Sequence, residues 1–245
     1  MKPLRIPTIQ RTFLRFSGEA EVSIGLHYSG TFESKIWEQM TPIGSMTKTA
    51  YALFEVRDES PYKTWGDLVT AAKENPGKLT CGTPVAGGMN EVIMNDISKA
   101  TGIKLRLVPF ASSPASGTAL YGGHIDFRLT QPSVASTMLL AKKTRGLAVS
   151  LDERMKIFPD IPTFKELGIG GNILLSAAIW GPPKLPANII KMLTKIIQKT
   201  TEDPGYIKIM EQRAQVLHYR PPEELKAHML NFDKEFGAKL AETYK

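Results

Sequence analysis

The stretch TWGDLVTAAKENPGKLTCG, residues 64–82, contains the clearest helix signal in this chain of 245 residues. Thr64 and Asp67 have the spacing of a capping box, in which each residue satisfies a backbone N–H group of the other. Apolar side chains then recur at helical spacing, at Trp65, Leu68, Val69 and Ala72. Asn75-Pro76-Gly77 ends the predicted helix, and Lys78 to Gly82 predicts a short strand.

The same alternation of helix and strand continues toward the C-terminus. A second helix is predicted by Met89, Val92, Ile93, Ile97 and Ala100, and it stops at Gly102. Further strands are expected over residues 105–108, 125–129, 145–150, 173–180 and 216–219, and shorter helices over 114–121, 133–141 and 206–213. Thr163 and Glu166 predict another capping box, for a very short helix that Gly168 closes. Two long amphipathic helices finish the chain, one with Ile189, Leu193, Ile196 and Ile197, the other with Leu225, Met229, Phe232, Phe236 and Leu240. This pattern is typical of an α/β fold with a mostly parallel sheet flanked by helices.

Composition excludes several classes of protein. No apolar run approaches the roughly 20 residues that cross a bilayer. Met1 to Gly18 has a basic start but lacks the apolar stretch of a secretory signal. The single cysteine, Cys81, and four scattered histidines show no zinc-site spacing. The net charge of +7 comes without clustered basic residues or a docking motif, so we expect no nucleic-acid partner.

A series of short motifs runs along the chain in order. They are SPYKT (60–64), AAKENPGKL (71–79), CGT (81–83), VPF (108–110), LYGGHID (120–126), RGLAV (145–149), FPDIPTFKELG (158–168) and WGPP (180–183). From about Glu33 onward the chain resembles the solute-binding receptors of tripartite tricarboxylate transporters, the TctC or Bug-type family.

This resemblance implies a type II periplasmic-binding-protein fold with two lobes, each a mostly parallel sheet flanked by helices. Residues 60–175 would form lobe two, and residues 1–59 with 176–245 would form lobe one. The resemblance also implies a periplasmic, monomeric receptor that delivers a small carboxylate to membrane subunits of the transporter. The family's usual signal peptide and first strand with its Pro-Gly-Gly loop have no counterpart in Met1 to Ala20, so lobe one is expected to be incomplete.

A glycine-rich loop between a predicted strand and helix is the main candidate site. A helix N-terminus offers unpaired N–H donors and the positive end of the helix dipole, and glycines let an anion approach the backbone. The candidate ligand-binding residues in this segment are Thr83, Ala86, Gly87, Gly88, Met89 and Asn90. The loop matches neither the Walker A pattern nor GxGxxG, so no phosphate cofactor is expected. Without the resemblance, a plain strand-to-helix turn is the favoured explanation of the loop, because a glycine-rich loop alone is weak evidence of a site.

Other candidates follow the neighbouring predicted strands. Thr130, Gln131 and Ser133 are expected to form the opposite wall of the site, or else simply to cap a helix. Phe110 and Ala111 are expected to add an apolar contact and backbone amides, with core packing as the alternative for Phe110. From lobe one, Ser29 follows a predicted strand over Glu21 to His27 and is a further candidate.

Three alternative functions remain open at this point. Cys81 at a strand end, with His124 as its base, would be the start of an enzyme, but the sequence shows no third orienting group. The same fold also serves ligand-sensing modules that report to a partner protein. Finally, a shortened lobe one would leave a remnant that binds nothing. Asp126 and Asp160 are interpreted as turn or capping residues.

Overall fold

The computed structural model describes residues 15–17, 20–30, 34–84, 89–169 and 173–243. The chain divides into two compact units, each described here by itself. Unit 1 consists of Met1–Lys48 and Leu175–Lys245, and unit 2 consists of Thr49–Leu174. Strand β2 (Thr41–Ala50) carries the chain out of unit 1, and β8 (Leu174–Leu175) carries it back.

Unit 2 is built on a sheet with the strand order β5-β4-β6-β3-β7. The strands are β3 (Leu53–Arg57), β4 (Thr80–Pro84), β5 (Arg106–Phe110), β6 (Phe127–Thr130) and β7 (Thr144–Val149). β4 pairs in parallel with β5 and β6, whereas β3 runs antiparallel to both of its neighbours, β6 and β7. β4 to β7 therefore share one direction, and their C-terminal ends lie at the same edge of the sheet.

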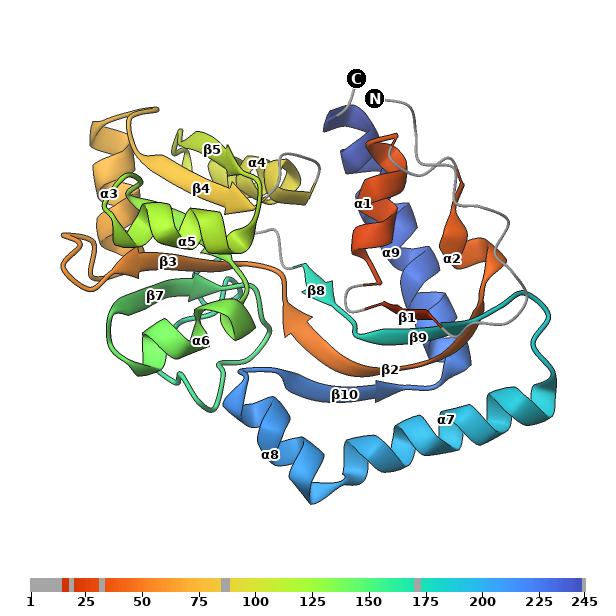
Figure 1. Ribbon diagram of the computed structural model, residues 1–245. Helices are drawn as coiled ribbons and strands as arrows, with labels where there is room; N and C mark the ends of the chain where they lie inside the picture. The colour runs from red at the N-terminus through yellow and green to blue at the C-terminus, as the bar shows by residue number, and fades with distance from the viewer. Residues whose placement is uncertain (1–14, 18–19, 31–33, 85–88, 170–172, 244–245) are drawn as a thin grey trace. The chain divides into compact units, whose positions relative to one another are not determined.

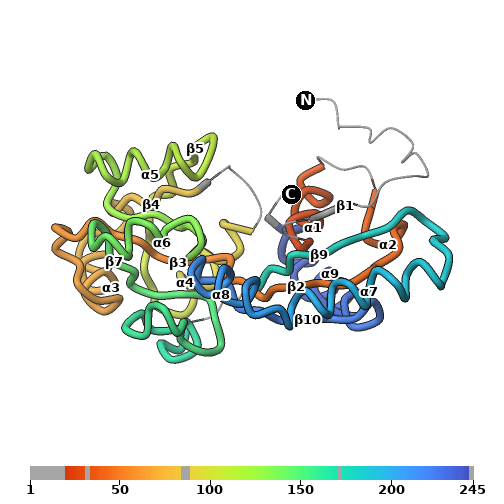
Figure 2. Tube along the Cα trace, turned by 60° about the horizontal axis from the view of Figure 1, so that its bottom comes forward, coloured from red at the N-terminus to blue at the C-terminus, as the bar shows by residue number. Residues whose placement is uncertain are grey.

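Helices cover both faces of this sheet (Figures 1 and 2). They are α3 (Trp65–Glu74), α4 (Met89–Thr101), α5 (Ser113–Tyr121) and α6 (Pro132–Leu140). Under α3, the Phe54 ring contacts the rings of Trp65, Phe127 and Phe164 at centroid distances of 5.0, 5.7 and 5.8 Å. Phe54 alternates with Glu55 along β3, so the aromatic core occupies one face and the charged side chain the other.

Both predicted capping boxes form. At the start of α3, Asp67 N–H donates to Thr64 Oγ1, and Asp67 Oδ2 accepts from Thr64 N–H. Thr163 and Glu166 exchange the same pair of bonds, but residues 164–168 form turns rather than the predicted short helix. Hydrogen bonds from the Thr64 and Lys63 backbone hold the pKa of Asp67 below its ordinary value.

The boundary of unit 2 differs from the expected start at residue 60. β3 lies in the segment that was predicted to belong to lobe one, but it pairs with β6 and β7 near the middle of the unit 2 sheet. Backbone hydrogen bonding thus places β3 in unit 2. No strand is predicted for this segment from the sequence, because Glu55 and Arg57 interrupt its apolar run.

Unit 1 contains a sheet in which β1 (Arg15–Ser17), β9 (Ala178–Gly181), β2 and β10 (Val216–Arg220) lie in that order. These neighbours all pair antiparallel, so the mostly parallel sheet predicted for this lobe is wrong for its described strands. The reason is the path of the chain, since β9 returns from unit 2 beside the outgoing β2. The α/β class itself holds in both units.

Two groups of helices accompany this sheet. α7 (Ala187–Glu202) and α8 (Pro204–Gln212) pack over Ile43 and Met46 through Ile197 and Tyr206. The helices α1 (Val22–Tyr28), α2 (Ile36–Gln39) and α9 (Pro222–Thr243) complete the unit, and α1 packs against α9. None of the helices in the described part of the chain is both long and apolar enough to cross a membrane.

The strand predicted over Glu21 to His27 is wrong, because most of this segment forms α1. Its alternation of polar and apolar residues mimics a strand, but contact with α9 favours the helix. Glu21, which precedes α1, is buried, accepts a hydrogen bond from Ser176 N–H and contacts His228 Nε2 at 2.6 Å. The Glu21 carboxylate thus links three parts of unit 1 that are far apart in the sequence: the start of α1, Ser176 and His228.

Candidate functional site

The C-terminal ends of β4 and β6 adjoin at one edge of the unit 2 sheet, and β5 ends on the other side of β4. Each of these strands leads into a helix, α4 from β4, α5 from β5 and α6 from β6. In open α/β sheets this is the edge at which ligands bind. The structure therefore gathers the predicted unit 2 candidates at neighbouring strand ends.

The β4 end carries the first group of candidates. Thr83 is buried near the end of β4, and Met89 and Asn90 begin α4, where both side chains are buried. The Tyr51 hydroxyl donates to Asn90 Oδ1 at 2.9 Å and so fixes the orientation of this amide. Ala86, Gly87 and Gly88 lie outside the described residues.

Tyr51 is a residue that sequence reasoning missed. It lies in the bend between β2 and β3, where its own N–H donates to the Ile173 carbonyl. Tyr51 thus bonds both to Ile173, through its backbone, and to Asn90, through its side chain. No sequence signal marked Tyr51, because neither adjoining strand was predicted.

The β6 end carries the second group. Thr130 is 2% exposed, and its Oγ1 has no hydrogen-bond partner among the described residues. Gln131 is the N-cap residue of α6 but makes no side-chain capping bond, and the half-buried Ser133 accepts a bond from Ser136 at its carbonyl. Gln131 thus occupies the N-cap position that the capping alternative assigns to this segment, whereas the Thr130 hydroxyl takes no part in capping.

The structure places the other predicted site residues, Phe110 with Ala111 and Ser29, in different settings. Phe110 packs against the buried cluster of Ala119, Leu120 and Ile125, and the exposed Ala111 follows it in the bend before α5. Core packing therefore accounts for much of Phe110. Ser29 does not follow a strand; it is the C-cap of α1, and its hydroxyl donates to the Leu26 carbonyl.

A surface pocket of about 650 Å³ lies elsewhere in unit 2, beside the first half of β7. Arg145 and Arg154 line it, but Arg145 pairs with Asp58 at 2.6 Å and Arg154 with Glu166 at 2.9 Å. None of the predicted ligand-binding residues lines this pocket. Lys63 and Lys142 also line the pocket, so it is a competing anion site within unit 2.

Cys81, the nucleophile of the enzyme alternative, lies inside the sheet core. It is fully buried, and its thiol contacts the Gly82 carbonyl at 3.8 Å. Burial raises the pKa of this thiol far above its ordinary value. A reactive cysteine needs the thiolate and access to its substrate, and both are disfavoured here.

We expect Cys81 to resist a thiol reagent such as Ellman's reagent in the native protein at pH 7 to 8. Labelling should become stoichiometric only in denaturant, because unfolding exposes the thiol and returns its pKa to about 8.5. Release of thionitrobenzoate, followed by absorbance, measures both states. Complete labelling of the native protein within seconds would show that Cys81 is accessible and would restore the nucleophile hypothesis.

Comparison with known proteins addresses the family directly. The model of the tripartite tricarboxylate transporter family receptor, TctC, matches residues 27–224. The chain belongs to this receptor family. A curated Agrobacterium vitis relative, described as a UPF0065 protein in the TAR-I ttuE-ttuC' intergenic region, is 31% identical over 70% of this chain and 49% of its own length. The chain thus spans about half the length of that curated relative.

Solved structures of similar fold include two that contain bound carboxylates. MatC from Rhodopseudomonas palustris, solved with bound malate, is 17% identical, with a TM-score of 0.71 over 95% of this chain and 79% of its own. An R. palustris protein solved with adipate is 19% identical, with a TM-score of 0.73 over 84% of this chain and 69% of its own. At these identities the likeness shows the fold, which agrees with the predicted type II periplasmic-binding-protein class.

Proposed function

We propose that this chain is the ligand-binding part of a periplasmic receptor for a small organic carboxylate, which it delivers to the membrane subunits of a tripartite tricarboxylate transporter. Family membership supports the receptor role. The malate and adipate held by the two similar structures support a carboxylate as the class of ligand. A binding role, rather than catalysis, also agrees with the burial of Cys81 and the raised pKa of its thiol.

The observation that carries the proposal is the buried Thr130 hydroxyl. A buried hydroxyl without a partner costs about 1–3 kcal/mol, so its presence needs an explanation. Thr130 ends β6 beside the end of β4, and α4 is the helix that follows β4 along the chain. The N–H groups and dipole of this 13-residue helix favour an anion at its N-terminus. In the proposed complex, Thr130 Oγ1 donates to a ligand carboxylate and thereby gains its missing partner.

Within the same proposal, the remaining candidates surround the carboxylate. Thr83 and Asn90 belong to the β4 side, and Gln131 and Ser133 to the β6 side. Tyr51 joins them, because it holds the Asn90 amide in one orientation. These groups are neutral, which suits a receptor that has to release its ligand, since a buried charge is costly when the site is empty.

Replacing Thr130 by valine is expected to raise the Kd for malate or adipate about tenfold. A hydrogen bond to a charged group contributes about 1.5–3 kcal/mol, and 1.4 kcal/mol corresponds to a factor of ten in affinity. Isothermal titration calorimetry of the wild type and the variant measures this change. The melting temperature should not fall, because the substitution removes an unsatisfied polar group.

Thr144→Val is the matched control for this experiment. Thr144 is also buried, and its Oγ1 also lacks a partner among the described residues, but it begins β7 and so lies at the opposite end of a parallel strand. We expect the Thr144→Val variant to bind malate and adipate with the same Kd as the wild type. Equal affinities for the Thr130 and Thr144 variants would contradict the placement of the ligand at the β6 end.

A further inference from the structure

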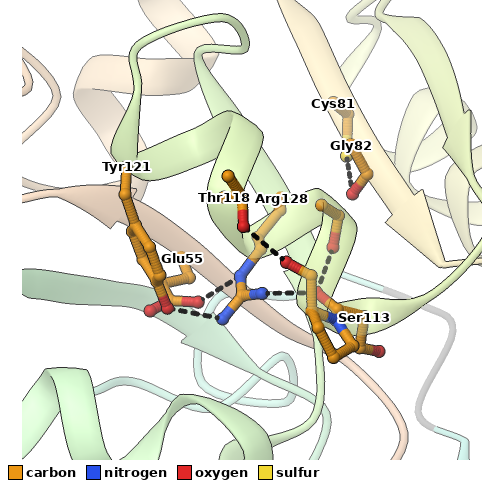
Figure 3. A network of polar contacts seen from close by, with 9 residues as sticks. Glu55, Cys81, Gly82, Ser113, Thr118, Tyr121 and Arg128 are labelled. Atoms are coloured by element: carbon orange, nitrogen blue, oxygen red, sulfur yellow. Dashed lines mark hydrogen bonds and ion pairs between the residues drawn. The ribbon is translucent and has the colours of Figure 1, made fainter.

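A buried ion pair lies on the face of the unit 2 sheet that α5 covers (Figure 3). Arg128 on β6 is 1% exposed, and its Nε donates to Oε2 of the fully buried Glu55 on β3 at 2.5 Å. The remaining guanidinium nitrogens turn to α5. Nη1 donates to the Ser113 carbonyl at 3.0 Å, and Nη2 donates to the Tyr121 hydroxyl at 3.2 Å.

These contacts hold α5 at both of its ends. Ser113 is the first residue of the helix and Tyr121 is the last. Gly117 lies midway between them, and a Cβ atom there would come within 2.6 Å of Arg128 Nη1. The absence of a side chain at Gly117 thus lets the helix lie directly across the guanidinium.

A gain in folding stability does not by itself explain the buried ion pair of Glu55 and Arg128. The desolvation of two buried charges commonly cancels their attraction, and a well-packed apolar pair is often as stable or more so. Glu55 Oε1 also lacks a hydrogen-bond partner among the described residues, so its desolvation is not fully offset. What the pair supplies, and an apolar pair would not, is directional contact with chosen atoms of α5.

The position of α5 matters because its start belongs to the C-terminal edge of the sheet. Ser112 caps the helix by accepting from Ala115 N–H, and Phe110 and Ala111 lead into it from β5. On the neighbouring strand, Arg128 precedes Thr130 by two residues, so both side chains lie on the same face. One side chain therefore connects the start of α5 to the strand that carries Thr130.

We infer that Arg128, held by Glu55, is a positioning residue that fixes the start of α5 at the edge of the sheet where the carboxylate binds. The inference rests on the proposed function for its ligand, but not for its effect on the helix. In this account Arg128 does not touch the ligand. It affects binding only by fixing the position of α5. Its loss should weaken binding without removing any ligand contact.

The test replaces the pair by apolar residues in the double variant Glu55→Leu/Arg128→Met. This change avoids an unpaired buried charge, and replacement of a buried ion pair by apolar residues is often neutral or stabilising. Hydrogen exchange, resolved by residue with NMR, reports on Ala115 and Ser116, whose N–H groups bond to Ser112 at the start of α5. We expect exchange there to accelerate about tenfold, and the Kd for malate to rise about tenfold, which is a change of 1.4 kcal/mol in each case.

The half-exposed pair of Arg145 and Asp58 provides the matched control. Asp58→Asn/Arg145→Met removes another ion pair of unit 2 and should leave both readouts unchanged. If the first double variant does not unfold cooperatively, Tyr121→Phe replaces it. That variant keeps both charges and removes the hydroxyl that accepts from Nη2. We expect Tyr121→Phe to accelerate exchange at Ala115 and Ser116 and to raise the Kd for malate, as the double variant does.

The outcomes separate the two proposals. Unchanged exchange at Ala115 and Ser116 would overturn the positioning role, whatever the ligand. Faster exchange with an unchanged Kd would overturn the link to the binding site. A wild-type protein that binds no carboxylate would overturn the proposed function, while the exchange rates would still decide whether Arg128 fixes α5.

Discussion

Arg128→Met alone is expected to lower the free energy of unfolding by about 3–5 kcal/mol, because it leaves Glu55 as a buried, unpaired carboxylate. Glu55 is fully buried on β3, and its other oxygen already lacks a partner among the described residues. Urea denaturation followed by circular dichroism measures the change. This would be a large fraction of the 5–15 kcal/mol that stabilises a typical protein.

The double variant Glu55→Leu/Arg128→Met is the control, since it removes both charges and should recover most of that loss. The difference between the single and double variants isolates the cost of the unpaired charge. A loss below about 1 kcal/mol for Arg128→Met would indicate that water reaches Glu55 and that the pair is not desolvated.

Phe54→Ala is expected to destabilise unit 2 to a similar extent, by about 3–5 kcal/mol. The ring is fully buried and contacts three other aromatic rings, from α3, β6 and the turn that contains Phe164. Its removal leaves a cavity in a rigid setting that cannot easily collapse. Thermal and urea unfolding of the variant measure the loss.

Leu140→Ala is the comparison for this cavity variant. Leu140 ends α6 and is 57% exposed, so its truncation should change stability by no more than about 0.5 kcal/mol. Equal losses for the two variants would contradict the assignment of Phe54 to the centre of the unit 2 core.

The elements of unit 2 after Ser60 were predictable because their signals are local. The capping box at Thr64 and the apolar spacing that follows identify α3, and the structure confirms both. The expected strands that lead into α4 and α6 are also confirmed, with ends shifted by one or two residues. Hydrophobic periodicity and turn residues decide these segments without help from distant parts of the chain.

The segments that tertiary contact decides were not predictable in the same way. β2 and β3 were missed, and α1 was predicted as a strand although α9 packs against it as a helix. Arg128 had no sequence signal either, since arginine is almost never fully buried without a partner. Its partner, Glu55, lies 73 residues earlier in the chain.

The candidate site was predictable in outline. Strand order brings the ends of β4 and β6 together, as the placement of Thr83, Asn90 and Thr130 after predicted strands suggested. The sequence could not show that Tyr51 orients Asn90, or that Ser29 caps a helix. Those facts depend on contacts between segments whose structure was missed or predicted wrongly.

An NMR titration of the isotope-labelled protein with malate and with adipate tests the central claim most directly. The account predicts saturable shifts of backbone amides at the C-terminal edge of the unit 2 sheet, including those of Thr83, Asn90 and Gln131. Amides beside the pocket near Arg145 should not move. Saturable shifts confined to that pocket, or no shifts with either ligand at millimolar concentration, would contradict the proposal that this edge binds a carboxylate.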